Sequence, residues 1–162
     1  MRFIVLSSVF VIALFAESRW PLRHVTQPKW QRVRRNLGLA AIGAIFVRFA
    51  FIPLELWAAD FVSGARIGLM NQLELDWPVR VAISFLILDY TLFVVHYLNH
   101  RIPFLWRFHL VHHADMDMDV TTSIRFHFGE LACSSFFRVG FIFIFGIDVW
   151  TLLFLVACIT GF

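Results

Sequence analysis

The 162-residue chain has a formal net charge of +3, and 60% of its residues are hydrophobic while only 15% are charged. Its mean hydropathy is +0.77. Soluble domains average about 45–50% apolar and about 25% charged residues, so this composition excludes an ordinary soluble protein and indicates a bilayer protein. We expect one domain over residues 1–162, because no linker, repeat or low-complexity segment divides the chain. Cys133 and Cys158 lack CxxC spacing and indicate neither a thiolate metal site nor a disulfide framework.

The first apolar run covers residues 3–16 and is shorter than the roughly 20 residues that a spanning helix needs. Arg2 supplies the basic start of a signal peptide only weakly, and residues 15–18 do not offer a convincing small-x-small cleavage site. We therefore favour an uncleaved first helix over a signal peptide.

A basic segment follows at residues 17–36, where Glu17 is the single acidic residue. Its basic residues are Arg19, Arg23, His24, Lys29, Arg32, Arg34 and Arg35. Lysine and arginine beside membrane segments are retained in the cytoplasm, so we predict a cytoplasmic loop here. Nucleic acid is an alternative ligand for a basic run. The flanking apolar runs and the interleaved Trp20 and Trp30 instead favour anionic lipid headgroups, and we expect no nucleic-acid partner.

Residues 37–59 are long enough to span a bilayer but contain Arg48, Pro53 and Glu55, which must face protein or water. Pro53 predicts a kink or a break into two shorter helices. Residues 60–78 should then connect this span to the next one on the side of the membrane opposite the basic segment, with a short interfacial helix over residues 65–73. The next apolar run, residues 79–95, returns the chain to the side of the basic segment.

Six of the seven histidines fall within residues 89–130. They are His96, His100, His109, His112, His113 and His127. Residues three or four apart share one face of a helix, so each closely spaced group can direct its imidazoles at a common point. Pro103 disfavours helix at the residue before it, which predicts one helix ending near Arg101 and a new helix from about Phe104. A lone histidine would be a core residue, but this grouping predicts a metal site.

Acidic residues accompany the histidines. Asp115, Asp117 and Asp119 alternate as in a calcium-binding loop, but Val120 and Phe126 stand where that loop has glycine and glutamate. We prefer Asp115 and Asp119 as acceptors for imidazole N–H groups, or else a solvated loop. Asp89 lies seven residues before His96 on the same helical face. It could either accept a hydrogen bond from an imidazole or have a structural role within the membrane.

The chain closes with a phenylalanine-rich membrane run over residues 136–162, which contains Arg138 near its start and Asp148 inside it. Aromatic density of this kind usually reflects helix packing, although this run could also line a lipid channel.

Histidine ligation without thiolates suits iron, zinc, copper or nickel, and the spacing does not choose among them. Zinc hydrolysis usually needs three protein ligands and a base, so six histidines favour two metal ions.

The histidine region resembles the fatty acid hydroxylase / sterol desaturase superfamily. The similarity lies in His96-x3-His100, in LWRFH-x2-HH ending at His113, in the acidic loop, and in DVTTSIRFHFGE ending at Glu130. It implies a four-helix-type membrane scaffold with a cytoplasm-facing di-iron centre that uses dioxygen and two electrons to hydroxylate or desaturate a lipid. Zinc can substitute for iron, and the electrons would come from a cytochrome b5-like protein or from a ferredoxin and its reductase.

The resemblance also implies roles at the end of this region. His127 would be a further metal ligand or lie near the metal, Glu130 would orient it, and Arg125 would support them. The alternative is that Arg125 and Glu130 form an ion pair on the surface at the start of a helix. Two departures are visible: Phe128 stands where the family usually has proline, and the family's later histidine box is absent before Phe162.

We therefore predict an all-α, polytopic membrane bundle of about four hydrophobic segments with a cytoplasm-facing histidine-rich cap, incomplete at its C-terminus. The expected function is oxidation of a sterol, fatty acid or related lipid. The alternatives are a non-catalytic metal-binding membrane protein and an ether-lipid monooxygenase of the same superfamily. A di-metal centre built of imidazoles needs about six to eight histidines, so we expect weak or single-metal occupancy and no lipid turnover by residues 1–162 alone.

Overall fold

The computed structural model describes residues 2–20, 24 and 26–160, with side chains described for residues 8–20, 24 and 26–158. Arg23 of the basic segment lies outside these residues. Regular structure in the described chain is entirely helical, which confirms the predicted class. The elements are α1 (Arg2–Arg19), α2 (Lys29–Phe46), the π-helix η1 (Val47–Phe51), α3 (Ile52–Gly64), α4 (Leu69–Gln72), α5 (Trp77–Arg101), α6 (Pro103–His113), the 3-10 helix η2 (Val120–Ile124), α7 (Phe128–Phe145) and α8 (Val149–Thr160).

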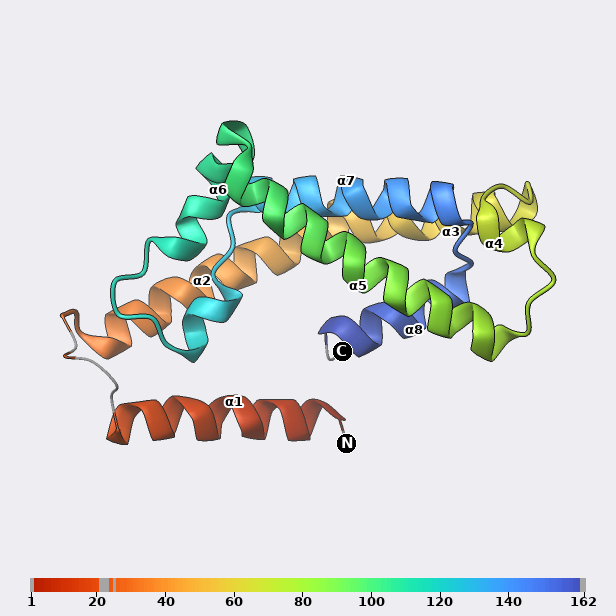
Figure 1. Cartoon of the computed structure of the whole chain (residues 1–162). Coiled ribbons are helices and arrows are strands. Elements are labelled where there is room, and N and C mark those ends of the chain that lie inside the picture. Colours follow the sequence, from red (N-terminus) through yellow and green to blue (C-terminus); the bar gives the residue numbers. More distant parts are fainter. Residues whose placement is uncertain (1, 21–23, 25, 161–162) are drawn as a thin grey trace.

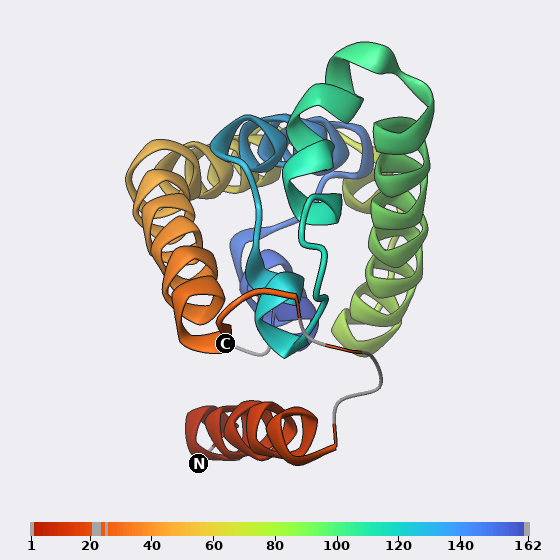
Figure 2. The same ribbon diagram turned by 90° about the vertical axis from the view of Figure 1, so that its left-hand side faces the viewer.

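Three helical segments of the described chain are long and apolar enough to cross a bilayer: Lys29–Gln72, Trp77–Arg101 and Phe128–Phe145. A shorter apolar helix covers Val149–Cys158. These segments run side by side along the bundle, and α7 lies against α3 (Figure 1). The view toward one end shows α2 and α5 on opposite flanks, with α6 and η2 between them (Figure 2). Length and composition thus indicate an integral membrane protein.

The predicted interruption near Pro53 is a π-helical turn. The proline ring removes one backbone N–H and crowds the preceding turn, so regular α-helical hydrogen bonding cannot continue through it. The π-helix η1 absorbs this mismatch immediately before α3, and the helical path from α2 to α3 remains continuous. Phe51 of η1 is buried and packs edge-on against Phe136 of α7, with ring centroids 5.3 Å apart.

The connection after α3 contains the four-residue helix α4, which is shorter than the predicted helix over residues 65–73. Arg66 and Gly68 have left-handed φ values of 54° and 92°, which prevent a longer helix. Gly68 also packs against Gly146 so closely that a Cβ atom on Gly68 would lie 2.2 Å from the Gly146 nitrogen. This contact fixes α4 beside the end of α7.

The main hydrophobic core lies between α3, α4, α5, α7 and α8. Its fully buried members include Val62, Leu88, Ile142, Ile147 and Leu155. This core belongs to the half of the bundle that contains the α4 connection, so the opposite half is left for polar groups.

Two charged residues predicted to lie within membrane segments form an ion pair. Nη1 of Arg138 lies 3.1 Å from each carboxylate oxygen of Glu55, which is 3% exposed. The pair links α7 to α3 and satisfies the requirement that charges in a bilayer face protein or water. Asp148 instead caps α8 by accepting hydrogen bonds from the Thr151 nitrogen and hydroxyl at 2.9 and 2.7 Å.

The basic and acidic segments meet at one end of the molecule. The backbone nitrogens of Thr26 and Gln27 donate to Asp117 at 2.9 and 2.7 Å, and the Val120 nitrogen donates to Glu17 at 2.9 Å. The α4 connection lies at the other end of the bundle (Figure 1). The described residues of the basic segment and the histidine region therefore share one end, as the charge pattern predicted.

Candidate metal centre

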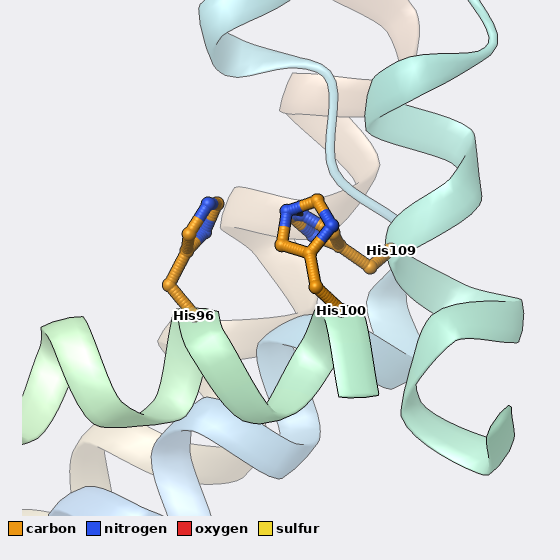
Figure 3. A group of neighbouring side chains, drawn as sticks. All are labelled: His96, His100 and His109. Atoms are coloured by element: carbon orange, nitrogen blue, oxygen red, sulfur yellow. Dashed lines mark hydrogen bonds between the residues drawn. The ribbon is translucent and has the colours of Figure 1, made fainter. Parts of the chain in front are cut away.

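Imidazoles from α5 and α6 converge on one point. Pro103 ends α5 at Arg101 and starts α6, as predicted, so that the two helices meet at a sharp corner. His96 and His100 extend from α5 toward His109 of α6 (Figure 3). The ring centroids of His96 and His100 lie 4.9 and 4.7 Å from that of His109. One ligand atom from each of these three side chains can be chosen so that all lie within 4.8 Å of one another.

His113 joins the same group from the next turn of α6. The Nε2 atom of His109 lies 3.2 Å from Nε2 of His100 and 3.1 Å from Nε2 of His113. Imidazole nitrogens bind zinc-like ions at about 2.0–2.1 Å, so two ligands of one tetrahedral or octahedral ion lie about 3.0 to 3.4 Å apart. The separations in this group match that range. We call His96, His100, His109 and His113 the histidine group.

Glu130 of α7 fixes the tautomer of His109. Its Oε1 lies 2.7 Å from Nδ1 of His109, and both side chains are buried. An ionised carboxylate only accepts hydrogen bonds, so Nδ1 carries the proton and the Nε2 lone pair points toward His100 and His113. Asn99 of α5 also donates to Oε1 at 3.5 Å. A carboxylate behind a ligating imidazole is a common support of metal sites.

The environment keeps His109 neutral. Burial lowers its pKa to about 4, and the neighbouring His100 and His112 add to this lowering. Burial, followed by His109, also lowers the pKa of His113. Metal ions bind the deprotonated imidazole, so these shifts leave the lone pairs available at neutral pH.

His112 lies beside the histidine group and faces another direction. Its ring stacks on His109 with centroids 5.6 Å apart and on Phe126 with centroids 5.2 Å apart. Successive helical residues are rotated by about 100°, which separates His112 from His113 around α6. Nδ1 of His112 is buried without a hydrogen-bond partner among the described residues. This nitrogen is therefore free to act as a ligand.

His127 begins α7. Its Nδ1 accepts a hydrogen bond from the Gly129 nitrogen at 3.0 Å, and its ring stacks on Phe108 with centroids 5.2 Å apart. The partner of Glu130 is thus His109, whereas the resemblance had implied His127. A histidine whose Nδ1 caps a helix can offer only Nε2 to a metal.

The other acidic residues that were expected to support imidazoles have different surroundings. Asp89 is exposed on α5 and makes no hydrogen bond within the described chain. Although Asp89 shares a helical face with His96, seven residues separate them by about 10.5 Å along the helix. Spacing along the helix does not by itself bring the Asp89 carboxylate into contact with an imidazole.

Asp115 and Asp119 bind Arg32 of α2. Asp115 accepts hydrogen bonds from Asn36 at 3.0 Å and Thr122 at 2.9 Å, and Asp119 pairs with the Arg32 guanidinium. Within the described chain, neither carboxylate bonds to an imidazole. The alternating acids therefore surround a guanidinium instead of calcium, because α2 brings Arg32 to the loop.

Arg125 belongs to this same network. Its Nη1 lies 3.7 Å from Asp115 and donates to the Asn36 amide oxygen at 3.4 Å. Within the described chain it does not form the surface pair with Glu130 that was the alternative to a supporting role, because Oε1 of Glu130 contacts His109 and Asn99 instead.

The sequence assigned no individual role to several residues of the site, although Trp106 and Phe126 lie within the motifs that carry the family resemblance. Trp106 contacts the rings of His100 and His113 at centroid distances of 5.3 and 5.6 Å. Asn99 and Phe126 reach the site as described above. Arg32 and Asn36 are four residues apart and hence share one helical face, but Gln31 and Arg35 have the same spacing, so the sequence did not single them out.

A bundle of apolar helices with an imidazole cluster at one end defines a membrane protein with a candidate metal centre. The chain belongs to the fatty acid hydroxylase family, because the model of that family matches residues 81–162. This range covers most of α5 and all six clustered histidines. No curated protein and no solved structure matches the chain. Membership indicates a membrane-bound oxidoreductase of the lipid hydroxylase or desaturase type.

Proposed function

We propose that this protein is an iron-dependent oxidoreductase that uses dioxygen to hydroxylate or desaturate a membrane lipid. The observation that carries the proposal is the convergence of Nε2 atoms of His100 and His113 on Nε2 of His109, at 3.2 and 3.1 Å. This donor set fits a first-row transition metal, and the buried Nδ1 of His112 fits a ligand to a second ion. Bound iron would supply the oxygen activation that no amino-acid side chain provides.

The chain's own residues prepare the site for the metal. Glu130 holds the proton of His109 on Nδ1, which leaves Nε2 as a donor to the metal. Trp106 covers one side of the group through its contacts with His100 and His113. The ordered rings restrict the positions that the ligands can take, and a displacement of about 1 Å can cost on the order of a hundredfold in rate.

A groove between α5 and α7 supports the proposal that the substrate is a lipid. Its volume is about 370 Å³, and its lining includes Thr91, Phe136, Phe137 and Ile144. The Thr91 hydroxyl donates to the Ile87 carbonyl at 2.7 Å, so it adds little polarity to the apolar lining. Thr91 precedes His96 by five residues, or about 7.5 Å along the helix. An acyl chain lying there would have one end near the histidine group.

We assign the histidine end to the cytoplasmic side. The basic segment contacts the acidic loop at that end, and basic residues beside membrane helices are retained in the cytoplasm. This placement gives the centre access to a soluble electron donor, such as a ferredoxin with its reductase or a cytochrome b5-like protein.

Metal analysis of the purified protein tests the centre. We expect bound iron or a substituting metal in the wild type and a sharp loss in His109→Ala, while His24→Ala, altered at an exposed position, should retain the metal. Incorporation of ¹⁸O from ¹⁸O₂ into lipid tests hydroxylation, and formation of a new C=C bond in the lipid tests desaturation. Either reaction should depend on NADPH, a ferredoxin and its reductase. Equal metal content in the wild type and His109→Ala would contradict the assignment.

A photoreactive fatty acid tests the groove. Labelling should map to α7 between residues 136 and 145 and decrease in Gly140→Trp, which places an indole in the groove. Gly38→Trp is the matched control, because a Cβ atom at either glycine meets no atom within 4 Å. Equal labelling of both variants would show that the fatty acid binds elsewhere.

A further inference from the structure

The last turn of α6 carries two histidines but has little packing of its own. The buried residues of α6 are Leu105 and His109, both N-terminal to this turn. The turn ends at His113 and is followed by Ala114 outside the helix. The positions of His112 and His113 therefore depend on how the following loop is held.

Residues of α2 hold the start of that loop. The Arg32 guanidinium is 3% exposed and faces three carboxylates. Its Nε lies 3.8 Å from Asp115, its Nη1 lies 3.3 Å from Asp117, and its Nη2 pairs with Asp119. Three carboxylates this close repel one another unless a cation lies between them. Asp115, two residues beyond His113, is thereby tied to α2.

Asn36 joins the two ends of the loop. Its amide nitrogen donates to Asp115 at 3.0 Å and to the Thr121 hydroxyl at 2.8 Å, and its amide oxygen accepts from Arg125 at 3.4 Å. The side chain is completely buried. Phe126, the residue after Arg125, stacks on His112. Asn36 thus holds both stretches of chain that carry the His112–Phe126 contact: Asp115, shortly after His112, and Arg125, directly before Phe126.

We propose that Arg32 and Asn36 are positioning residues of the metal centre: through the loop 114–127 they set the orientation of His112 and His113. This inference rests on the proposed function, since it assumes that the histidines bind a metal. Both residues belong to α2 and lie outside the part of the chain that matches the family. The metal centre accordingly depends on a helix that contributes no ligand.

The chemistry of Arg32 explains why lysine would be a poor replacement. Guanidinium presents five donors in a planar fork and can contact several carboxylates at once, whereas an ammonium is a compact point charge. Arg32→Lys should keep the charge while losing part of the geometry. Arg32→Met removes the charge and leaves buried carboxylates without their cation.

Titration of the detergent-solubilised, metal-free protein with Co²⁺ tests the proposal, because the cobalt d–d absorption reports ligand number and geometry. Loss of groups that orient metal ligands typically lowers affinity about 10- to 100-fold. We expect a loss of this size and an altered d–d spectrum in Arg32→Met and Asn36→Leu, with a smaller loss in Arg32→Lys. Arg34→Met, altered at an exposed arginine of the same helix, should match the wild type.

Thermal unfolding of the metal-free variants separates positioning from general stability. A lower Tm together with unchanged Co²⁺ affinity and spectrum would overturn the proposal. If Arg32→Met does not fold, Arg32→Lys decides the question, since unchanged affinity and spectrum there would also overturn it. Absence of Co²⁺ binding by the wild type would instead contradict the proposed function.

Discussion

The carboxylate of Glu130 lies 2.7 Å from Nδ1 of His109, which joins α7 to the imidazole at the middle of the histidine group. This contact is made inside the bundle by two buried side chains. The tautomer of His109 that can bind a metal through Nε2 therefore depends on how α7 packs against α6.

Removing this contact should weaken metal binding without removing a histidine. Glu130→Gln keeps an acceptor for Nδ1–H but loses the charge, so we expect a decrease in Co²⁺ affinity of about tenfold. Glu130→Leu removes the acceptor and should approach about a hundredfold. Asp89→Asn, at an exposed carboxylate of α5, is the control for loss of one negative charge. Competition titration with a chelator measures all three affinities, and equal losses in Asp89→Asn and Glu130→Gln would point to a nonspecific charge effect.

His127 should be required for stability more than for metal content. Its Nδ1 caps α7, and loss of a capping side chain costs about 1 kcal/mol. We expect His127→Ala to lower the Tm while retaining the metal, and His127→Asn to restore the cap. Metal analysis with thermal unfolding checks this, and a metal loss equal to that of His109→Ala would place His127 among the ligands.

The low pKa of His109 predicts that acid destabilises the metal-free protein. The unfolded imidazole has a pKa of 6.5 and the folded one about 4, so between these values the unfolded state binds the additional proton. Lowering the pH from 7 to 5 should therefore reduce the free energy of unfolding by about 2 kcal/mol through this group. The contribution is constant above about pH 7. Thermal unfolding across this range should show a smaller decrease for His109→Gln than for the wild type.

Cysteine labelling tests the arrangement of the ends. After replacement of Cys133 and Cys158, single cysteines at Gln31 and Met116 should react with an impermeant reagent from one side of the membrane. A cysteine at Gln72, the last residue of α4, should react from the other side. All three positions are exposed. Labelling of Gln31→Cys and Gln72→Cys from the same side would refute the arrangement, and labelling in intact cells identifies the compartment.

The ion pair between Glu55 and Arg138 should be costly to break. Arg138→Leu leaves a buried carboxylate without its cation, and removal of one partner of a buried pair costs about 3 kcal/mol or more. The double variant Glu55→Leu with Arg138→Leu should recover most of this loss, because apolar replacement of both partners leaves no uncompensated charge. Unfolding in detergent measures the difference, and an equally unstable double variant would mean that packing outweighs charge at this site.

The sequence determined the features that depend on neighbours along the chain. Composition requires a bilayer protein, and Pro103 separates two helices whose histidines repeat at three- and four-residue intervals. Pro53 requires an interruption in the second span, although proline alone does not choose between a break and the π-helical turn that forms. The asymmetric distribution of arginine located the basic segment and the histidines at one end, because each intervening span reverses the side.

Only the tertiary structure decided which side chains meet. The sequence placed Glu130 three residues from His127, yet the rotation of α7 against α6 directs Glu130 to His109. Asp115 and Asp119 follow the histidines directly, but packing of α2 supplies Arg32, a stronger partner for carboxylates than a neutral imidazole. Periodicity specifies the face on which a residue lies. Whether another helix brings a partner to that face depends on how helices distant in sequence are placed and rotated against one another.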